Sequence, residues 1–196
     1  MAEQQKGDSA KALLDRNNGQ KSGKAGKYLT FRLAGEEYGL EILKVREIIG
    51  LMDITAVPRT PHFIRGVINL RGKVIPVVDL RKKFGMDSVE DTEQTCIIVV
   101  DVSRNGKPVQ MGILVDSVSE VLDIRGDDIE DTPSFGSDFD ATFILGMAKA
   151  KGTVKILLNI EEVLTAADMI AVAHAASDTR TDKQALSFEE EAPHGD

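Results

Sequence analysis

The stretch FIRGVINLRGKVIPVVDLRKKF, residues 63–84, decides the fold of this chain. Two runs rich in β-branched residues, Val67 to Leu70 and Val74 to Leu80, predict two strands. The runs meet at a short turn in which Gly72 can adopt the positive φ that a tight connection requires. The stretch therefore predicts a β-hairpin with Arg71 at its tip.

The hairpin pattern recurs in the second half of the chain. At an offset of 80 the matched pairs are Ile64 and Ile144, Gly66 and Gly146, Gly72 and Gly152, and Val74 and Val154. At an offset of 73 they are Gly39 and Gly112, Val45 and Val118, and Glu47 and Glu120. We therefore expect two copies of one unit of about 75 residues.

Short strands separated by turn residues predict an all-β protein of two small barrels that share a hydrophobic core. Residues 44–49 fit either a short helix or a bent strand, and Asn105-Gly106 predicts a further hairpin turn. The expected organisation is a disordered tail over 1–27, a first barrel over about 28–90, a second over about 91–160, a helix over 161–176 and a disordered acidic tail over 177–196.

Composition places the chain among globular proteins, and its charge is unevenly spread. The chain has 196 residues, 42% of them hydrophobic, and no run approaches the roughly 18 apolar residues of a membrane span. A cytoplasmic location without membrane insertion is expected.

Residues 59–83 hold seven basic residues against one acidic, whereas residues 87–140 hold fourteen acidic against three basic. This asymmetry fits either a solvated mixed surface or opposed faces for contacts with other proteins.

Motifs for catalysis, metals and cofactors are missing from the sequence. Residues 66–73 have five residues between their glycines and end before Val74, so they fail the phosphate-loop pattern. The histidines are scattered, and Cys96 opens an apolar run that favours a buried, inert thiol. The acidic residues of 127–131 lack calcium-loop spacing, which favours a solvated loop, although an enzyme that uses this loop stays open as a third hypothesis. We expect no enzyme activity, no metal and no cofactor.

Arg71 and Glu47 are the charged residues that remain to be explained. A guanidinium presents a planar fork suited to a carboxylate, so the pair could fix the hairpin against the preceding segment. Two interpretations stay open at this point: a site for contact with a partner, and a purely structural salt bridge.

The motif Gly66-Val67-Ile68-Asn69-Leu70-Arg71-Gly72, followed by residues 74–81, resembles the signature of the bacterial chemotaxis coupling protein family, CheW. The resemblance continues through residues 36–48 and covers about residues 28–176. It implies two interlocked five-stranded barrels like those of Src-homology-3 (SH3) domains, which agrees with the internal duplication.

The resemblance also implies a function and partners. It implies a non-catalytic adaptor that couples transmembrane chemoreceptors, through their cytoplasmic tips, to the regulatory domain of the histidine kinase CheA at membrane-associated receptor arrays. Carried over by position, the receptor- or kinase-contact residues are Val45, Glu47, Gly66, Asn69 and Arg71. The alternative is a nucleic-acid-binding small β-barrel, suggested by the basic residues of 59–83. The net charge of −8 and the lack of aromatic residues among those basic ones argue against nucleic acid as a partner.

Overall fold

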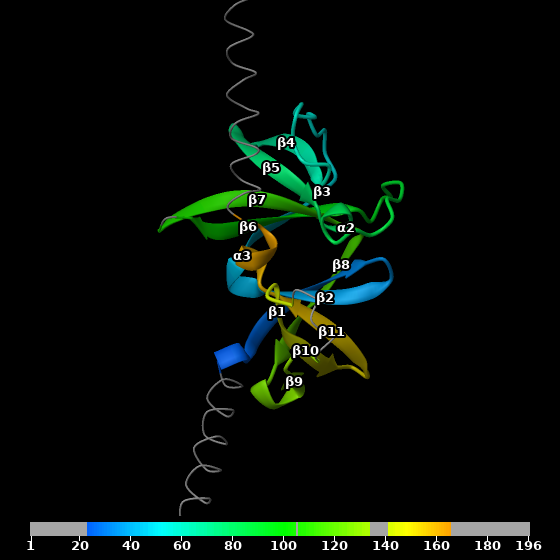
Figure 1. The fold of residues 1–196 in the computed structure, drawn as a ribbon, viewed down its shortest axis with the longest axis vertical. Coiled ribbons are helices and arrows are strands. Elements are labelled where there is room, and N and C mark those ends of the chain that lie inside the picture. The colour runs from blue at the N-terminus through cyan, green and yellow to red at the C-terminus, as the bar shows by residue number, and fades with distance from the viewer. Residues whose placement is uncertain (1–22, 105, 134–140, 166–196) are drawn as a thin grey trace, which may run out of the picture. The chain divides into compact units, whose positions relative to one another are not determined.

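The chain forms two β-sheets joined by short helices, as seen in a computed structural model that describes residues 23–104, 106–133 and 141–165 (Figure 1). The strands fall into two compact units. Of the described residues, unit 1 contains those up to Arg46 and those within 116–163, and unit 2 contains those within 47–115 together with Leu164 and Thr165. The prediction of an all-β protein with two barrel-like units is confirmed.

The sheet of unit 1 has six strands in the order β8-β1-β2-β11-β10-β9. Their bounds are β1 Gly26–Leu33, β2 Glu36–Glu41, β8 Ser117–Ile124, β9 Ile129–Glu130, β10 Ile144–Ala150 and β11 Thr153–Leu158. Neighbouring strands are antiparallel except β2 and β11, which pair in parallel. Two short helices, η1 (Ile42–Lys44) and η2 (Gly126–Asp128), and the single turn α3 (Ile160–Val163) connect or follow these strands.

The sheet of unit 2 has five strands in the order β3-β6-β7-β5-β4. Their bounds are β3 Val45–Gly50, β4 Ile64–Leu70, β5 Lys73–Asp79, β6 Cys96–Arg104 and β7 Lys107–Val115. The parallel pair is β5 with β7, and the turn α2 (Leu80–Lys83) follows β5. β3 spans the boundary between the two units.

The two sequence copies exchange their first hairpins. Hairpin β1–β2 of the first copy joins β8 to β11 of the second, and hairpin β6–β7 of the second copy joins β3 to β5 of the first. The strand grouping therefore differs from the predicted barrel boundaries of 28–90 and 91–160. An internal repeat shows that two units exist, but it does not show which hairpin pairs with which, because both copies have equivalent edges.

Individual elements match the sequence predictions, with one open choice resolved and two boundaries changed. Residues 45–50 form strand β3, which resolves the open choice between helix and strand. β1 begins at Gly26, inside the segment predicted to be disordered, because backbone pairing of Gly26 with Ile124 orders the chain without apolar side chains. The predicted terminal helix begins at Ile160, and most of it lies outside the described residues, as do residues 1–22 and the whole predicted tail of residues 177–196.

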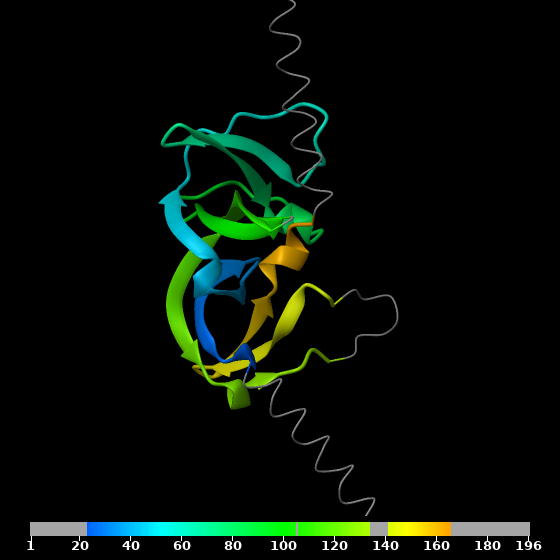
Figure 2. The same ribbon diagram turned by 90° about the vertical axis from the view of Figure 1, so that its left-hand side faces the viewer.

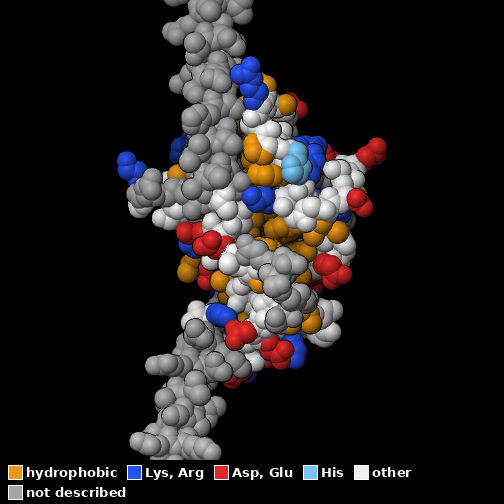
Figure 3. Space-filling model, in the orientation of Figure 1, with side chains coloured by type: hydrophobic (Ala, Val, Ile, Leu, Met, Phe, Trp, Pro, Cys, Tyr) orange, Lys and Arg blue, Asp and Glu red, His pale blue; other side chains and the backbone are white. Residues whose placement is uncertain are grey.

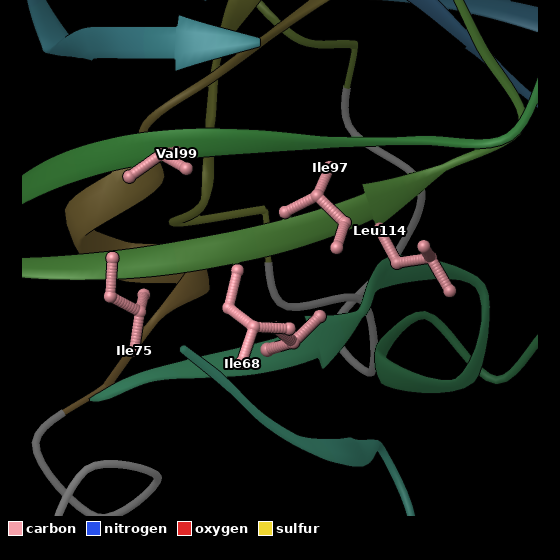
Figure 4. Close-up of a cluster of buried hydrophobic side chains, with 6 residues drawn as sticks. Ile68, Ile75, Ile97, Val99 and Leu114 are labelled. Carbon is pink, nitrogen blue, oxygen red and sulfur yellow. The ribbon is translucent and has the colours of Figure 1, made fainter. Parts of the chain in front are cut away.

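Each unit has its own cluster of buried hydrophobic side chains. In unit 2 the side chains from β4 and β5 point toward those from β6 and β7 (Figure 4). The members of this cluster are Ile68, Ile75, Val77, Ile97, Val99 and Leu114. In unit 1 the cluster contains Tyr28, Ile124, Ile129, Ala148 and Leu157. The further expectation of a core shared between the copies stays a prediction.

An ion pair between a buried lysine and a partly exposed glutamate links β2 to β11 in unit 1. The Lys155 Nζ donates to Glu37 Oε2, and the side chain of Lys155 is 4% exposed. This hydrogen bond lowers the pKa of Glu37 below its ordinary value of 4.5. A carboxyl group whose pKa is lower in the folded than in the unfolded state stabilises the fold above the unfolded pKa, and this contribution is lost as the pH falls through the folded pKa.

We therefore expect the free-energy cost of Glu37→Gln to shrink as the pH is lowered from 7 to below 4.5, the ordinary pKa of this group. Urea unfolding of both proteins across this range measures the difference. Glu36→Gln, at an exposed neighbouring position, serves as the control. If the cost of Glu37→Gln stays constant down to the acid end of the range, the Glu37 carboxylate does not stabilise the fold through its pairing with Lys155.

Candidate functional site

The turn between β4 and β5 places Arg71 at the tip of the hairpin, as predicted. Leu70 pairs with Lys73, so the connection has two residues, and Arg71 and Gly72 have φ values of 52° and 83°. Two consecutive positive φ values are typical of the type I′ turn that matches the twist of a hairpin. The Gly72 backbone N–H donates to Asn69 Oδ1 over 2.9 Å, which holds the turn. Asn69 therefore has a structural role at this site.

Arg71 and Glu47 form a bidentate ion pair, which confirms that the two residues lie within reach of each other. Nη1 donates to Oε1 over 2.9 Å and Nη2 donates to Oε2 over 2.7 Å. The Arg71 side chain is 75% exposed and that of Glu47 is 23% exposed. An exposed pair of this kind contributes about 0–1 kcal/mol to stability. Its main consequence is geometric, because it fixes the direction of an exposed guanidinium.

The ion pair also closes the sheet of unit 2. Glu47 lies in β3, which is first in the strand order, whereas Arg71 lies in the turn of the last two strands. Figure 2 shows the turn of the β4–β5 hairpin next to β3. Val45 is half-buried on the same side of β3 as Glu47, because side chains two residues apart share a face of a strand.

Gly66 is a buried packing position in β4. It lies at a β-bulge with a φ of 145°, and a Cβ atom there would lie 2.2 Å from the Thr55 carbonyl oxygen. Thr55 and Val67 exchange two backbone hydrogen bonds of 2.9 Å. Glycine is therefore required by the close approach of the Thr55 backbone. Sequence reasoning missed Thr55, since it precedes a Pro-rich segment that breaks any regular pattern.

The same ion pair recurs in unit 1. Lys151, with a φ of 52° at the tip of β10–β11, contacts Glu120 of β8 over 2.5 Å. Glu120 and Lys151 are the positions equivalent to Glu47 and Arg71 at the two sequence offsets. Sequence reasoning matched Glu120 but missed Lys151, which the offset of 80 could have identified. The recurrence shows that closing the sheet by such a pair is part of the repeated unit.

Many of the basic side chains of residues 59–83 have partners in unit 2. Arg65 contacts Asp91 over 2.5 Å, Lys82 Nζ lies 3.9 Å from Asp79 Oδ2, and Lys83 Nζ lies 4.2 Å from the centre of the Phe63 ring. The carboxylates of Asp91, Asp79 and Glu47 thus offset part of the positive charge of this stretch. A continuous basic groove for a phosphate backbone is therefore not favoured.

Several large hydrophobic side chains are exposed in unit 2. Val74, next to the Arg71 turn, is 71% exposed, and the others with substantial exposure are Ile48, Leu51, Met52 and Val89. On the face shown in Figure 3, hydrophobic side chains are interspersed with basic and acidic ones. An exposed apolar residue beside a fixed guanidinium suits contact with another protein.

Within the described ranges, no three His, Cys, Asp or Glu side chains gather as a metal site would require. Cys96 is buried, as predicted. None of the helices described is both long enough and apolar enough to span a membrane.

Comparison with known proteins assigns the family. Residues 27–168 match the model of the CheW-like domain. The chain is 38% identical over 149 residues to the chemotaxis protein CheW of Klebsiella aerogenes, covering 76% of this chain and 87% of the relative. It is 38% identical over 135 residues to CheW of Rhizobium meliloti, covering 69% and 84% of the two chains. The crystal structure of the scaffolding protein TtCheW from Thermoanaerobacter tengcongensis aligns with a TM-score of 0.64 at 37% identity, covering 74% of this chain and 95% of that one. The chain therefore belongs to the CheW-like domain family.

Proposed function

We propose that this protein is a non-catalytic adaptor of chemotaxis signalling that couples transmembrane chemoreceptors to the histidine kinase CheA. The observation that carries the proposal is the family match over residues 27–168, together with relatives that are named chemotaxis proteins and scaffolding proteins. The proposed partners are the cytoplasmic tip of a chemoreceptor and the regulatory domain of CheA. The proposed location is the cytoplasm, at membrane-associated receptor arrays.

The proposed contact residues are Val45, Glu47, Gly66, Asn69 and Arg71. The geometry supports different roles for them. Arg71 offers an exposed guanidinium, Glu47 fixes its direction, and Asn69 holds the turn. Gly66 supports the surface from inside, since it packs against the Thr55 backbone. Direct contact with a partner is therefore proposed chiefly for Arg71 and for residues exposed beside it.

Arg71→Ala tests the proposal. We expect cooperative unfolding with a loss of about 1 kcal/mol at most, since the pair is exposed. We expect binding to a receptor signalling fragment or to CheA to weaken about tenfold or more, because arginines at interface centres are often hot spots. Isothermal titration with each fragment and kinase assays with reconstituted receptor measure these effects.

Lys151→Ala is the matched control, because it removes an ion pair of the same kind at the equivalent turn of unit 1. We expect this variant to bind both fragments as the wild type does. If Arg71→Ala folds and binds both partners with unchanged affinity, Arg71 has only the structural role. If the folded wild type binds neither fragment, the adaptor function itself is wrong.

A further inference from the structure

Each unit is completed at one parallel strand pair, where a hairpin from one sequence copy meets the last strand of the other copy. In unit 1 this junction pairs β2 with β11, and in unit 2 it pairs β7 with β5. The two junctions have the same register, since Gly39 pairs with Leu157 and the equivalent Gly112 pairs with Val77. Either hairpin therefore presents a similar backbone edge to either acceptor strand.

Most paired positions do not distinguish the two junctions. The residues paired in unit 1 are Tyr38, Gly39, Leu40, Ile156, Leu157 and Leu158. Their equivalents in unit 2 are Met111, Gly112, Ile113, Pro76, Val77 and Val78. These twelve residues are glycine or largely hydrophobic, so their burial alone gives little preference between the native and the exchanged hairpin. Unit 2 also pairs Leu114 with the buried Asp79, where unit 1 has Glu41 and Asn159, so an exchange would in addition place Glu41 beside Asp79.

The adjacent pair of positions, one residue before the pairs above, carries very different side chains in the two units. Unit 1 has Glu37 beside Lys155, whereas the equivalent positions of unit 2 hold Gln110 and Ile75. Lys155 is 3% exposed as a whole residue, and its Nζ donates both to Glu37 and, over 2.6 Å, to Thr153 Oγ1. Ile75 is 2% exposed and belongs to the hydrophobic cluster of unit 2 (Figure 4).

We propose that the Glu37–Lys155 ion pair helps to select which hairpin completes which unit. If the hairpins were exchanged, Glu37 would face the apolar side chain of Ile75, and the buried Lys155 ammonium would face the neutral amide of Gln110. Because Lys155 is buried, the loss of its partner would be strongly unfavourable. Glu37 would lose less, since its side chain is 20% exposed and its Oε1 lies 3.8 Å from Nε of Arg32, in the same hairpin. This inference goes beyond the proposed function, because it concerns how a duplicated chain reaches one of two similar pairings.

The double variant Glu37→Gln with Lys155→Ile tests the proposal, because it gives unit 1 the side chains found at the junction of unit 2. After refolding from urea, we expect a second set of amide signals for Gly39 and Gly112, absent from the wild type. Nuclear Overhauser effects should connect β2 with β5 in that second form. Gel filtration separates exchange within one chain from exchange between two chains, and either form supports the proposal.

The charge-reversed variant Glu37→Lys with Lys155→Glu is the matched control. It keeps a complementary pair in unit 1 and is expected to restore a single set of signals with β2 paired to β11. The proposal is wrong if the neutral variant refolds to one native set of signals, or if the reversed pair gives the same mixture as the neutral one. If Glu37→Gln with Lys155→Ile does not fold, the variant Glu37→Leu with Lys155→Leu poses the same question with a fully apolar junction.

Discussion

We expect Gly66→Ala to lower the free energy of unfolding by about 3 kcal/mol or more, from backbone strain at a positive φ and from overpacking. The added Cβ would lie 2.2 Å from the Thr55 carbonyl oxygen and 2.8 Å from Ile54 Cγ2. Because the nearest atom belongs to the backbone, relief requires the Thr55 segment to move away from β4. Urea unfolding followed by circular dichroism measures the loss.

Gly72→Ala is the control for Gly66→Ala, because Gly72 also has a positive φ, 83°, but a Cβ there would meet no atom within 4 Å. We expect it to cost only about 1–2 kcal/mol, the conformational penalty of a left-handed backbone alone. Equal losses at the two positions would show that the Thr55 contact is unimportant. If Gly66→Ala weakens partner binding only in proportion to its unfolded fraction, Gly66 acts through the fold and not by contact.

Ile97→Ala is expected to destabilise the protein by roughly 2–5 kcal/mol, the usual cost of truncating a fully buried isoleucine. Ile97 is 0% exposed and lies in the hydrophobic cluster of unit 2. Val89→Ala, at a residue that is 55% exposed, should change stability by about 0.5 kcal/mol or less. Chemical denaturation of the two variants measures the difference.

A second variant identifies the cause of the Ile97 effect. Ile97 Cγ2 lies 2.8 Å from where a Cβ of Gly112 would be, so Gly112→Ala clashes with Ile97 in the wild type. In the Ile97→Ala background that atom is gone, and Gly112→Ala should cost less than it does alone. Strict additivity of the two changes in a double-mutant cycle would contradict this packing.

The hairpins and their turns could be predicted from the sequence because their causes are local. The alternation of β-branched residues around Arg71 and Gly72 predicted β4 and β5, and Asn105-Gly106 predicted the β6–β7 connection. The contact between Glu47 and Arg71 was also predicted, although its role in binding stays a prediction. In contrast, the packing of Gly66 against Thr55 left no local signal, since the two residues meet only through folding.

The sequence by itself determined the all-β class, the duplication and the resemblance to the CheW family, because repeat spacing, strand periodicity and turn residues are all visible along the chain. Only the tertiary structure decided that the first hairpins are exchanged between the copies, and that a buried Lys155 pairs with Glu37 at one junction while Ile75 fills the other. The physical reason is that strand edges from the two copies offer nearly the same backbone hydrogen bonds. The choice between them depends on side chains that lie more than a hundred residues apart in the sequence and become neighbours only in the folded unit.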